Sequence, residues 1–142
     1  PGQNLIGGRQ GVVAVFLAQA IGGNNIDVTG SLDRYRDLTY ITDNIDALIL
    51  GLDNRTSKET YNICSKTKIT IGEIIDNIIK VSNKPENYFS VNNIGSHDGD
   101  QFGNTGDNDK LKSLGWYPKV GLKEGLHNFY KYAENILEEI DG

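Results

Sequence analysis

Arg36 and Asp37 form an adjacent cation and anion within Gly30–Asn44, the stretch of this sequence best suited to binding chemistry. A guanidinium group can hold a phosphate through two parallel hydrogen bonds, which the single ammonium of a lysine cannot do. The alternation over Leu38–Ile41 predicts a strand, and Asp43 lies where a helix should begin. We therefore interpret Arg36 as a candidate phosphate-binding residue at the mouth of a strand. A surface ion pair with a neighbouring carboxylate is the alternative.

Periodic apolar residues predict the elements that must position this stretch. The expected helices are Val12–Ile21, Thr42–Leu52, Ile71–Lys80, Asp107–Leu114 and Leu122–Ile140, and the expected strands are Ile26–Thr29, Thr60–Cys64 and Tyr88–Val91. Thr70 and Glu73 have the spacing of a capping box in front of the third helix. We expect the apolar stripes, including Ile45, Leu48, Ile49 and Leu52, to be buried. Strands that alternate with amphipathic helices predict an α/β fold, with residues 1–142 as one domain.

Composition narrows the classes of partner. The chain has 142 residues and a net charge of −5, and no basic stripe that would neutralise nucleic-acid phosphates. It has a single cysteine, Cys64, which excludes an internal disulfide and fits a reducing compartment such as the cytoplasm. No apolar run is long enough to span a membrane. The chain has no methionine and begins with Pro1, so we expect it to be part of a longer protein.

The loop Asp98–Asp109 offers one alternative chemistry, calcium binding, because acidic and amide side chains recur along it. Phe102 stands where an oxygen ligand is needed, and Asp109 replaces the bidentate glutamate of such loops. We therefore predict no metal site. The glycines near the amino end follow no strand, so they do not indicate a dinucleotide site either.

Two groups of residues resemble a known family. At the carboxyl end, the pattern D-x-x-K-L-x-x-L-G-W-x-P followed by L-x-E-G-L is met by Asp107, Lys110, Leu111, Leu114, Gly115, Trp116, Pro118, Leu122, Glu124, Gly125 and Leu126. The earlier pattern G-x-x-x-x-x-R-D-x-x-Y-I-x-D is met by Gly30, Arg36, Asp37, Tyr40, Ile41 and Asp43. Further matches are Tyr61–Ile63, Gly99–Asp100 and Pro1–Gln3. Together they resemble the extended short-chain dehydrogenase/reductases, the NAD-dependent epimerase/dehydratase family that acts on nucleotide sugars.

The resemblance implies a division of labour along the chain. In the family, a Rossmann half binds NAD and carries a catalytic Tyr-x-x-x-Lys pair, and the other half binds the nucleotide sugar. No Tyr-x-x-x-Lys sequence occurs in this chain. It therefore resembles the substrate-binding half, with short strands and amphipathic helices, without the Rossmann half. NAD would be bound mainly by the part of the enzyme outside this chain, and the full-length enzyme would be a homodimer.

The resemblance also implies a set of substrate-binding residues. It assigns contacts with the diphosphate and nucleoside to Gln10, Gly11 and Val12, and contacts with the nucleobase and ribose to Asp27, Val28 and Thr29. It assigns a phosphate contact to Arg36 and a nucleotide contact to Asn62. Contacts with the phosphate and ribose are assigned to His97 and Asp100. His97 stands where the family usually has an arginine, so phosphate binding would be weaker or pH-dependent. Arg34 or Arg9 is the alternative source of the missing charge. No catalytic residue is expected in this chain.

The implied activity is 4-epimerisation of a UDP-sugar. In that mechanism the tyrosine removes the proton of the sugar 4-hydroxyl while hydride passes from C4 to NAD, and the hydride later returns to the other face. A 4,6-dehydratase or a decarboxylase of the same family is the first alternative. A stand-alone nucleotide-binding module without catalysis is the alternative from a different class.

Overall fold

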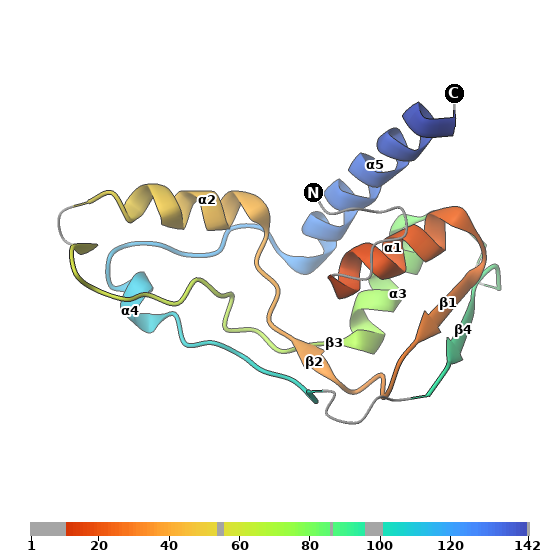
Figure 1. Ribbon diagram of the computed structural model, residues 1–142, viewed down its shortest axis with the longest axis horizontal. Coiled ribbons are helices and arrows are strands. Elements are labelled where there is room, and N and C mark those ends of the chain that lie inside the picture. Colours follow the sequence, from red (N-terminus) through yellow and green to blue (C-terminus); the bar gives the residue numbers. More distant parts are fainter. Residues whose placement is uncertain (1–10, 54–55, 86, 96–100, 142) are drawn as a thin grey trace.

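The computed structural model describes residues 11–53, 56–85, 87–95 and 101–141 (Figure 1). The helices are α1 Val12–Gly22, α2 Ile41–Leu50, α3 Ile71–Val81, α4 Asp109–Lys112 and α5 Leu122–Asp141. The strands are β1 Asn25–Val28, β2 Tyr35–Arg36, β3 Ile69–Thr70 and β4 Ser90–Asn93. Within these ranges, no helix is both long and apolar enough to cross a membrane.

The main core lies among α1, α3, α5 and β1, which pack on one another (Figure 1). β1 pairs in parallel with β4, with Asn25 opposite Ser90 and Val28 opposite Asn93. Side chains that are almost completely buried fill the space between the helices and this pair, among them Leu17, Ile26, Ile71, Ile74, Ile78 and Ala133. α1 is therefore a helix at the core, as its alanine-rich second half and the following glycines predicted.

α3 shows how local sequence determines an element. The hydroxyl of Thr70 accepts a hydrogen bond from the backbone N–H of Glu73 at 3.1 Å, and the Glu73 carboxylate accepts one from the Thr70 N–H at 2.7 Å. This reciprocal pair satisfies two backbone donors that the helix start would otherwise leave open. Ile74 and Ile78 then fall on one face and are completely buried against the core. The capping box and the helix predicted from it are confirmed.

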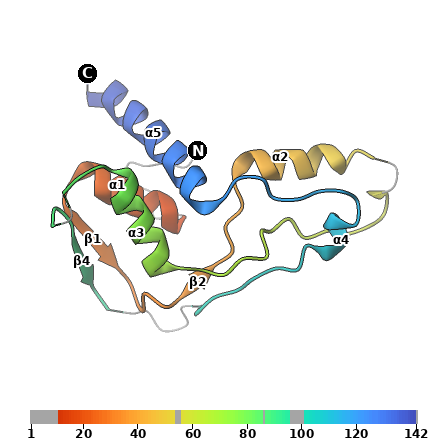
Figure 2. The ribbon, with the colours of Figure 1, turned by 180° about the vertical axis from the view of Figure 1, so that it is seen from behind.

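α2 and α4 lie at the opposite end of the molecule from β1 and β4, in both views (Figures 1 and 2). They are held there by a smaller cluster in which Ala47 of α2 packs with Leu111 of α4 and with Trp116. The predicted helix Asp107–Leu114 is shorter than expected, because α4 covers only Asp109–Lys112. The helix α5 agrees with its predicted span within a residue at its carboxyl end.

Two predicted strands are wrong and one is displaced. Residues 38–40 are irregular and Ile41 already begins α2, so the strand in this region is the two-residue β2, which pairs with β3. Thr60–Cys64 contains no strand, and β4 begins two residues later than the predicted Tyr88. Residues 37–40 and 60–64 are extended, but no backbone ladder holds them. The side chain of Asp37 instead binds the backbone of residues 65, 66 and 106.

The predicted burial of the α2 stripe is also wrong. Ile45, Leu48 and Ile49 are 46%, 63% and 61% exposed, and Leu52, just beyond the helix, is 85% exposed. α2 instead turns Asp43 and Ala47 inward, where both are buried. Periodicity locates an apolar face but does not say whether anything in the same chain covers it.

Candidate substrate-binding site

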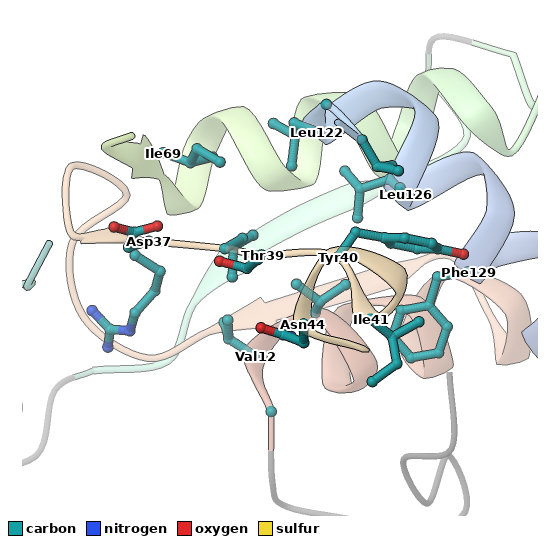
Figure 3. Close-up of a pocket in the computed structure, with 17 residues that line it drawn as sticks. Val12, Asp37, Thr39, Tyr40, Ile41, Asn44, Ile69, Leu122, Leu126 and Phe129 are labelled. Atoms are coloured by element: carbon teal, nitrogen blue, oxygen red, sulfur yellow. The ribbon is translucent and has the colours of Figure 1, made fainter. Parts of the chain in front are cut away.

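The candidate site is a cavity of about 590 Å³ between the amino-terminal ends of α1, α2 and α5 (Figure 3). Its walls are mostly apolar and include Val12, Leu38, Ile69, Leu122, Leu126 and Phe129. Its polar side chains come from the end of β2, from the connection between β2 and α2, and from the first turn of α2. They are Arg36, Asp37, Thr39, Tyr40 and Asn44. A mostly apolar cavity with a few polar groups gathered on one side is the usual form of a small-molecule site.

Arg36 ends β2 at the edge of this cavity. Its Nη1 donates to the backbone carbonyl of Tyr35 at 2.8 Å and lies 3.4 Å from that of Gln101. Among the described residues, no carboxylate forms a salt bridge with Arg36, and every hydrogen bond of its guanidinium comes from Nη1. Within the described residues, the edge formed by Nε and Nη2 donates no hydrogen bond, and such an edge can donate two parallel hydrogen bonds to an anion.

Asp37, next to Arg36, has a different role. Its Oδ1 accepts hydrogen bonds from the N–H and the hydroxyl of Ser65 at 2.8 and 2.7 Å. Its Oδ2 accepts from the N–H groups of Lys66 and Gly106 at 3.0 and 3.2 Å. One carboxylate thus holds together three segments that are distant in sequence. The role of Asp37 is therefore structural. Both of its carboxylate oxygens accept hydrogen bonds from other segments, and it forms no salt bridge with the adjacent Arg36 among the described residues.

The amino end of α1 opens onto the same cavity. Gly11 precedes the helix with φ of 81°, a conformation that glycine adopts without the strain of a side chain, and both Gly11 and Val12 line the cavity. Gly11, the N-cap residue, has no side chain that could cap this end, and the first turn contains no acidic residue. The N–H groups of a helix start and the helix dipole both favour an anion at such a position.

Tyr40 and Gly125 form a contact in the wall that the sequence analysis did not place in the site. A Cβ atom added to Gly125 would lie 3.1 Å from Cδ2 of Tyr40, so the ring rests on the helix where a side chain would normally stand. Figure 3 shows Tyr40 beside Leu126 and Phe129 of α5. Tyr40 and Gly125 both occupy fixed positions of the motifs quoted above. Those positions were the one feature of the sequence that could have pointed to a role for these two residues.

The other predicted residues that the structure describes lie outside the cavity lining. In β1, the carboxylate of Asp27 accepts a hydrogen bond from Asn92 at 3.1 Å and Val28 is buried. The carbonyl of Thr29 accepts one from Arg34, and Asn62 donates to the carbonyl of Asp107 at 3.1 Å. Their assignment to the nucleobase, ribose and nucleotide remains a prediction.

Gln10, His97, Asp100 and Arg9 lie outside the described residues. Of the two alternative sources of charge, Arg34 is described, and its guanidinium packs on the turn at Gly30 rather than in the cavity lining. The structure therefore brings together Gly11, Val12 and Arg36 from the predicted set.

Electrostatic contacts near the site are surface pairs. Lys66 forms salt bridges with Asp109 and Asp107, and the hydrogen bond to Asp109 is the main reason that the pKa of Lys66 is raised. Cys64 is buried, and desolvation raises the pKa of its thiol, so it is predominantly neutral at physiological pH. Neither arrangement provides a nucleophile or a general base.

No cofactor or metal site is assembled by the part of the chain that the structure describes. No group of three or more metal-ligating side chains occurs there, and part of the loop considered for calcium lies outside it. A Rossmann site needs a glycine-rich turn at the carboxyl edge of an extended parallel sheet, whereas the described sheets are two-stranded. The described residues thus do not fit NAD by themselves.

Comparison with known proteins relates the chain to one family. Residues 2–64 match the family model described as the NAD dependent epimerase/dehydratase family. The dTDP-4-dehydro-6-deoxyglucose reductase of Escherichia coli is 31% identical over 131 residues, which cover 89% of this chain. The chain is similar to enzymes of the epimerase/dehydratase group over most of its length. A putative UDP-glucose 4-epimerase of Methanocaldococcus jannaschii is 26% identical over 130 residues.

Solved structures of epimerase/dehydratase relatives share its fold. The UDP-glucose 4-epimerase of Thermotoga maritima, solved with UDP-glucose, matches 96% of this chain with a TM-score of 0.84 and 27% identity. An epimerase of Methanothermobacter thermautotrophicus matches with a TM-score of 0.85 at 22% identity, which supports the fold alone. The chain is thus a small α/β part of an extended short-chain dehydrogenase/reductase fold.

The matches cover only part of each relative. The chain spans 39% of the E. coli reductase and 43% of the T. maritima epimerase chain. The relatives also carry different names, which include reductase, 4-epimerase and UDP-N-acetyl-alpha-D-glucosaminuronate decarboxylase. The comparisons therefore show a similarity to epimerase/dehydratase enzymes and leave their several activities open for this chain.

Proposed function

We propose that this chain binds the nucleoside diphosphate of a nucleotide sugar, as the substrate-binding part of an NAD-dependent UDP-sugar 4-epimerase. The full-length enzyme would be a cytoplasmic homodimer. The observation that carries the proposal is the position of Arg36 on the cavity wall, where no described residue accepts a hydrogen bond from its Nε or Nη2 and Asp37 binds other segments.

A diphosphate at this position would meet two independent sources of positive potential. Arg36 would supply a charge-assisted, bidentate contact. The open amino end of α1, beside Gly11 and Val12, would supply backbone N–H groups and the positive end of a helix dipole, equivalent to about half an elementary charge. The T. maritima relative was solved with UDP-glucose, which supports a diphosphate ligand of this class.

The chain's contribution to the reaction would be orientation. Residues that hold the diphosphate fix the position of the sugar attached to it, and positioning of this kind can lower a barrier substantially. NAD, bound mainly by the remainder of the full-length protein, would supply the hydride acceptor. The proton-abstracting Tyr-Lys pair would lie there too, since this chain has no Tyr-x-x-x-Lys sequence. Purified alone with added NAD, the chain should not interconvert UDP-glucose and UDP-galactose.

A second candidate is reduction of a nucleotide-linked 4-keto sugar, which the 31% identity to the E. coli dTDP-4-dehydro-6-deoxyglucose reductase favours. Dehydration and decarboxylation within the family remain the further alternatives. Assays of the full-length protein separate these activities. Epimerisation of UDP-glucose without net oxidation of cofactor supports the proposal, whereas stoichiometric consumption of reduced cofactor with a 4-keto sugar supports the reductase.

Replacement of Arg36 tests the binding role. Arg36→Lys in the full-length protein should weaken UDP binding, because a point charge replaces a bidentate fork. A charge-assisted hydrogen bond is worth about 1.5–3 kcal/mol, so calorimetric titration should show a loss of roughly one to two powers of ten in affinity. NAD affinity should be almost unchanged.

Arg34→Lys is the matched control, because Arg34 packs on Gly30 and not in the cavity lining. Thermal melts of both variants separate folding from binding. Unchanged UDP affinity in Arg36→Lys with a large fall in melting temperature would show that Arg36 is structural, and the proposal would fail. Loss of affinity in Arg34→Lys alone would move the phosphate contact to Arg34.

A further inference from the structure

The guanidinium of Arg36 is oriented by backbone carbonyl groups from two segments that are distant in sequence. Its Nη1 lies 2.8 Å from the carbonyl oxygen of Tyr35, and 3.4 and 3.5 Å from those of Gln101 and Phe102. The first carbonyl belongs to β2 itself, and the other two belong to the segment that runs beside β2. The direction of the guanidinium therefore depends on how closely this segment approaches the strand.

The backbone of Tyr35 joins residues 101–103 to β2. The N–H of Tyr35 donates a 3.1 Å hydrogen bond to the carbonyl of Phe102, and Tyr35 and Gly103 form an isolated parallel bridge. The carbonyl of Phe102 is thus shared, because Nη1 of Arg36 reaches it as well. Any change that moves residues 101–103 away from Tyr35 would also move them away from Arg36.

The ring of Tyr35 rests on Gly103, where another residue type could not fit without a shift. A Cβ atom added to Gly103 would lie 2.7 Å from both Cγ and Cδ1 of Tyr35, which is closer than a Cβ atom approaches its neighbours in proteins. The backbone of Gly103 does not have a positive φ, so its own conformation does not require glycine. The requirement comes instead from the close approach of the ring.

The ring packs on the face of β2 that is turned away from the cavity. Phe102 meets it edge to face, with centroids 6.1 Å apart and planes at 78°, and Nζ of Lys68 lies 4.9 Å from its centroid. Arg36 pairs across the strands with Ile69, and both of these line the cavity. Successive side chains of a strand point to opposite faces, so Tyr35 can affect a ligand in the cavity only through the backbone and through Arg36.

We propose that Tyr35 and Gly103 are positioning residues, which orient the guanidinium of Arg36 toward a phosphate in the cavity. Their contact brings the carbonyl groups of residues 101 and 102 to Nη1, so that Nε and Nη2 bind the phosphate. A guanidinium that is held in advance loses less conformational freedom when the ligand binds. This inference rests on the proposed function for the identity of the ligand.

Gly103→Ala in the full-length protein tests the inference. The new Cβ should push residues 101–103 away from β2 and release Nη1, so calorimetric titration should show UDP binding that is weaker by about tenfold. Gly106→Ala is the matched control, because its Cβ would lie 2.6 Å from Sγ of Cys64 and would disturb the same segment away from the Tyr35 ring. It should lower the melting temperature and leave UDP affinity unchanged. Equal losses of affinity in the two variants would overturn the inference.

Substitutions of Tyr35 test the same contact from the other side. Tyr35→Leu removes the ring and should weaken UDP binding by a similar factor, whereas Tyr35→Phe keeps the ring and should retain the native affinity. An equal loss in both variants would overturn the inference, because the hydroxyl would then be the group that matters. Native UDP affinity in Tyr35→Leu, where Arg36→Lys has lost it, would also overturn the inference while the proposed function stands.

Nitrogen NMR of the Arg36 side chain gives a readout that needs no ligand. Hydrogen bonds to Nη1 should slow rotation about the Nε–Cζ bond, so that Nη1 and Nη2 give separate signals, which Arg36→Lys assigns by removing them. The two signals should merge in Gly103→Ala and stay separate in Gly106→Ala. Separate signals in both variants would overturn the inference. Merged signals in the Gly103→Ala variant of a protein that does not bind UDP would support the positioning contact and refute the proposed function, so the two failures are distinguishable.

Discussion

The indole Nε1 of Trp116 donates a 3.0 Å hydrogen bond to the backbone carbonyl of Asp43, across 73 residues of sequence. The carboxylate of Asp43 accepts two further bonds, from the N–H groups of Lys119 and Val120 at 3.0 and 3.1 Å. Asp43 and Trp116 are both almost completely buried. The start of α2 is therefore tied to the segment that leads into α5, and Val120 in that segment lines the cavity.

This arrangement predicts that Asp43→Asn destabilises the protein. The amide offers one acceptor oxygen where the carboxylate offers two, so one of the two partly buried N–H groups of Lys119 and Val120 loses its partner. The expected loss in free energy of unfolding is about 1–3 kcal/mol. Urea denaturation measures it.

Asp46→Asn is the matched control, with the same substitution in the same helix. Asp46 pairs with Lys119, whose side chain is 71% exposed, and such surface pairs contribute about 0–1 kcal/mol. Equal losses in the two variants would contradict the buried role of Asp43.

Asp37→Asn should distinguish the structural role of Asp37 from the proposed binding role of Arg36. The carboxylate accepts four hydrogen bonds from Ser65, Lys66 and Gly106, and the amide cannot accept all of them. We expect a loss of about 1.5–3 kcal/mol in the free energy of unfolding. UDP affinity of the variant that remains folded should fall much less than in Arg36→Lys. A stable Asp37→Asn with poor UDP binding would reverse the two assignments.

Gly125→Ala tests the contact between α5 and Tyr40. Replacing a helix-interior glycine by alanine normally stabilises a protein by about 0.5–1 kcal/mol. Here the new Cβ would lie 3.1 Å from Cδ2 of Tyr40, so the ring must shift and the gain should be cancelled. Gly22→Ala, at the last residue of α1, is the comparison, because an added Cβ there would meet no atom within 4 Å apart from its chain neighbours and its own helix backbone. Equal stabilisation in both variants, measured by urea denaturation, would show that the close approach is unimportant.

The capping box predicts a pH-dependent contribution from Glu73. The backbone N–H of Thr70 donates to its carboxylate and holds the pKa of Glu73 below its ordinary value of 4.5. A carboxyl group with a lowered pKa stabilises the folded state above the unfolded pKa, and this stabilisation is lost as pH falls through the folded pKa. The stability difference between the native protein and Glu73→Gln should therefore be full at pH 7 and shrink through the acid range. A difference independent of pH would contradict the charged cap.

The sequence predicted the elements that depend on neighbours along the chain. α3 was predicted because Thr70 and Glu73 interact over one turn, and α5 because its apolar period is long. The strand predicted at Leu38–Ile41 was wrong because Asp37 replaces a ladder with contacts to residues distant in sequence. No local pattern reports such contacts.

The same distinction applies to the site. Arg36 was predicted from the chemistry of its guanidinium and from the family resemblance, which also supplied Gly11 and Val12. All three residues line the cavity, and their role in binding remains a prediction. The approach of Tyr40 to Gly125 joins two motifs through the tertiary fold, so neither motif alone indicates it. The exposure of the α2 stripe was likewise hidden, because a periodic pattern does not identify what covers it.

The parallel pairing of β1 with β4 also determines how the chain must fold. Asp27 lies opposite Asn92, 65 residues later, so the pair closes a long loop that contains β2, α2, β3 and α3. Closing a loop of that length costs roughly 4 kcal/mol of chain entropy beyond a constant term, before either strand gains its hydrogen bonds. α3 needs only its own turn to begin, whereas β4 must wait until α1 and α3 have collapsed together. The pairing of β4 should therefore be the late and rate-limiting event when this chain folds.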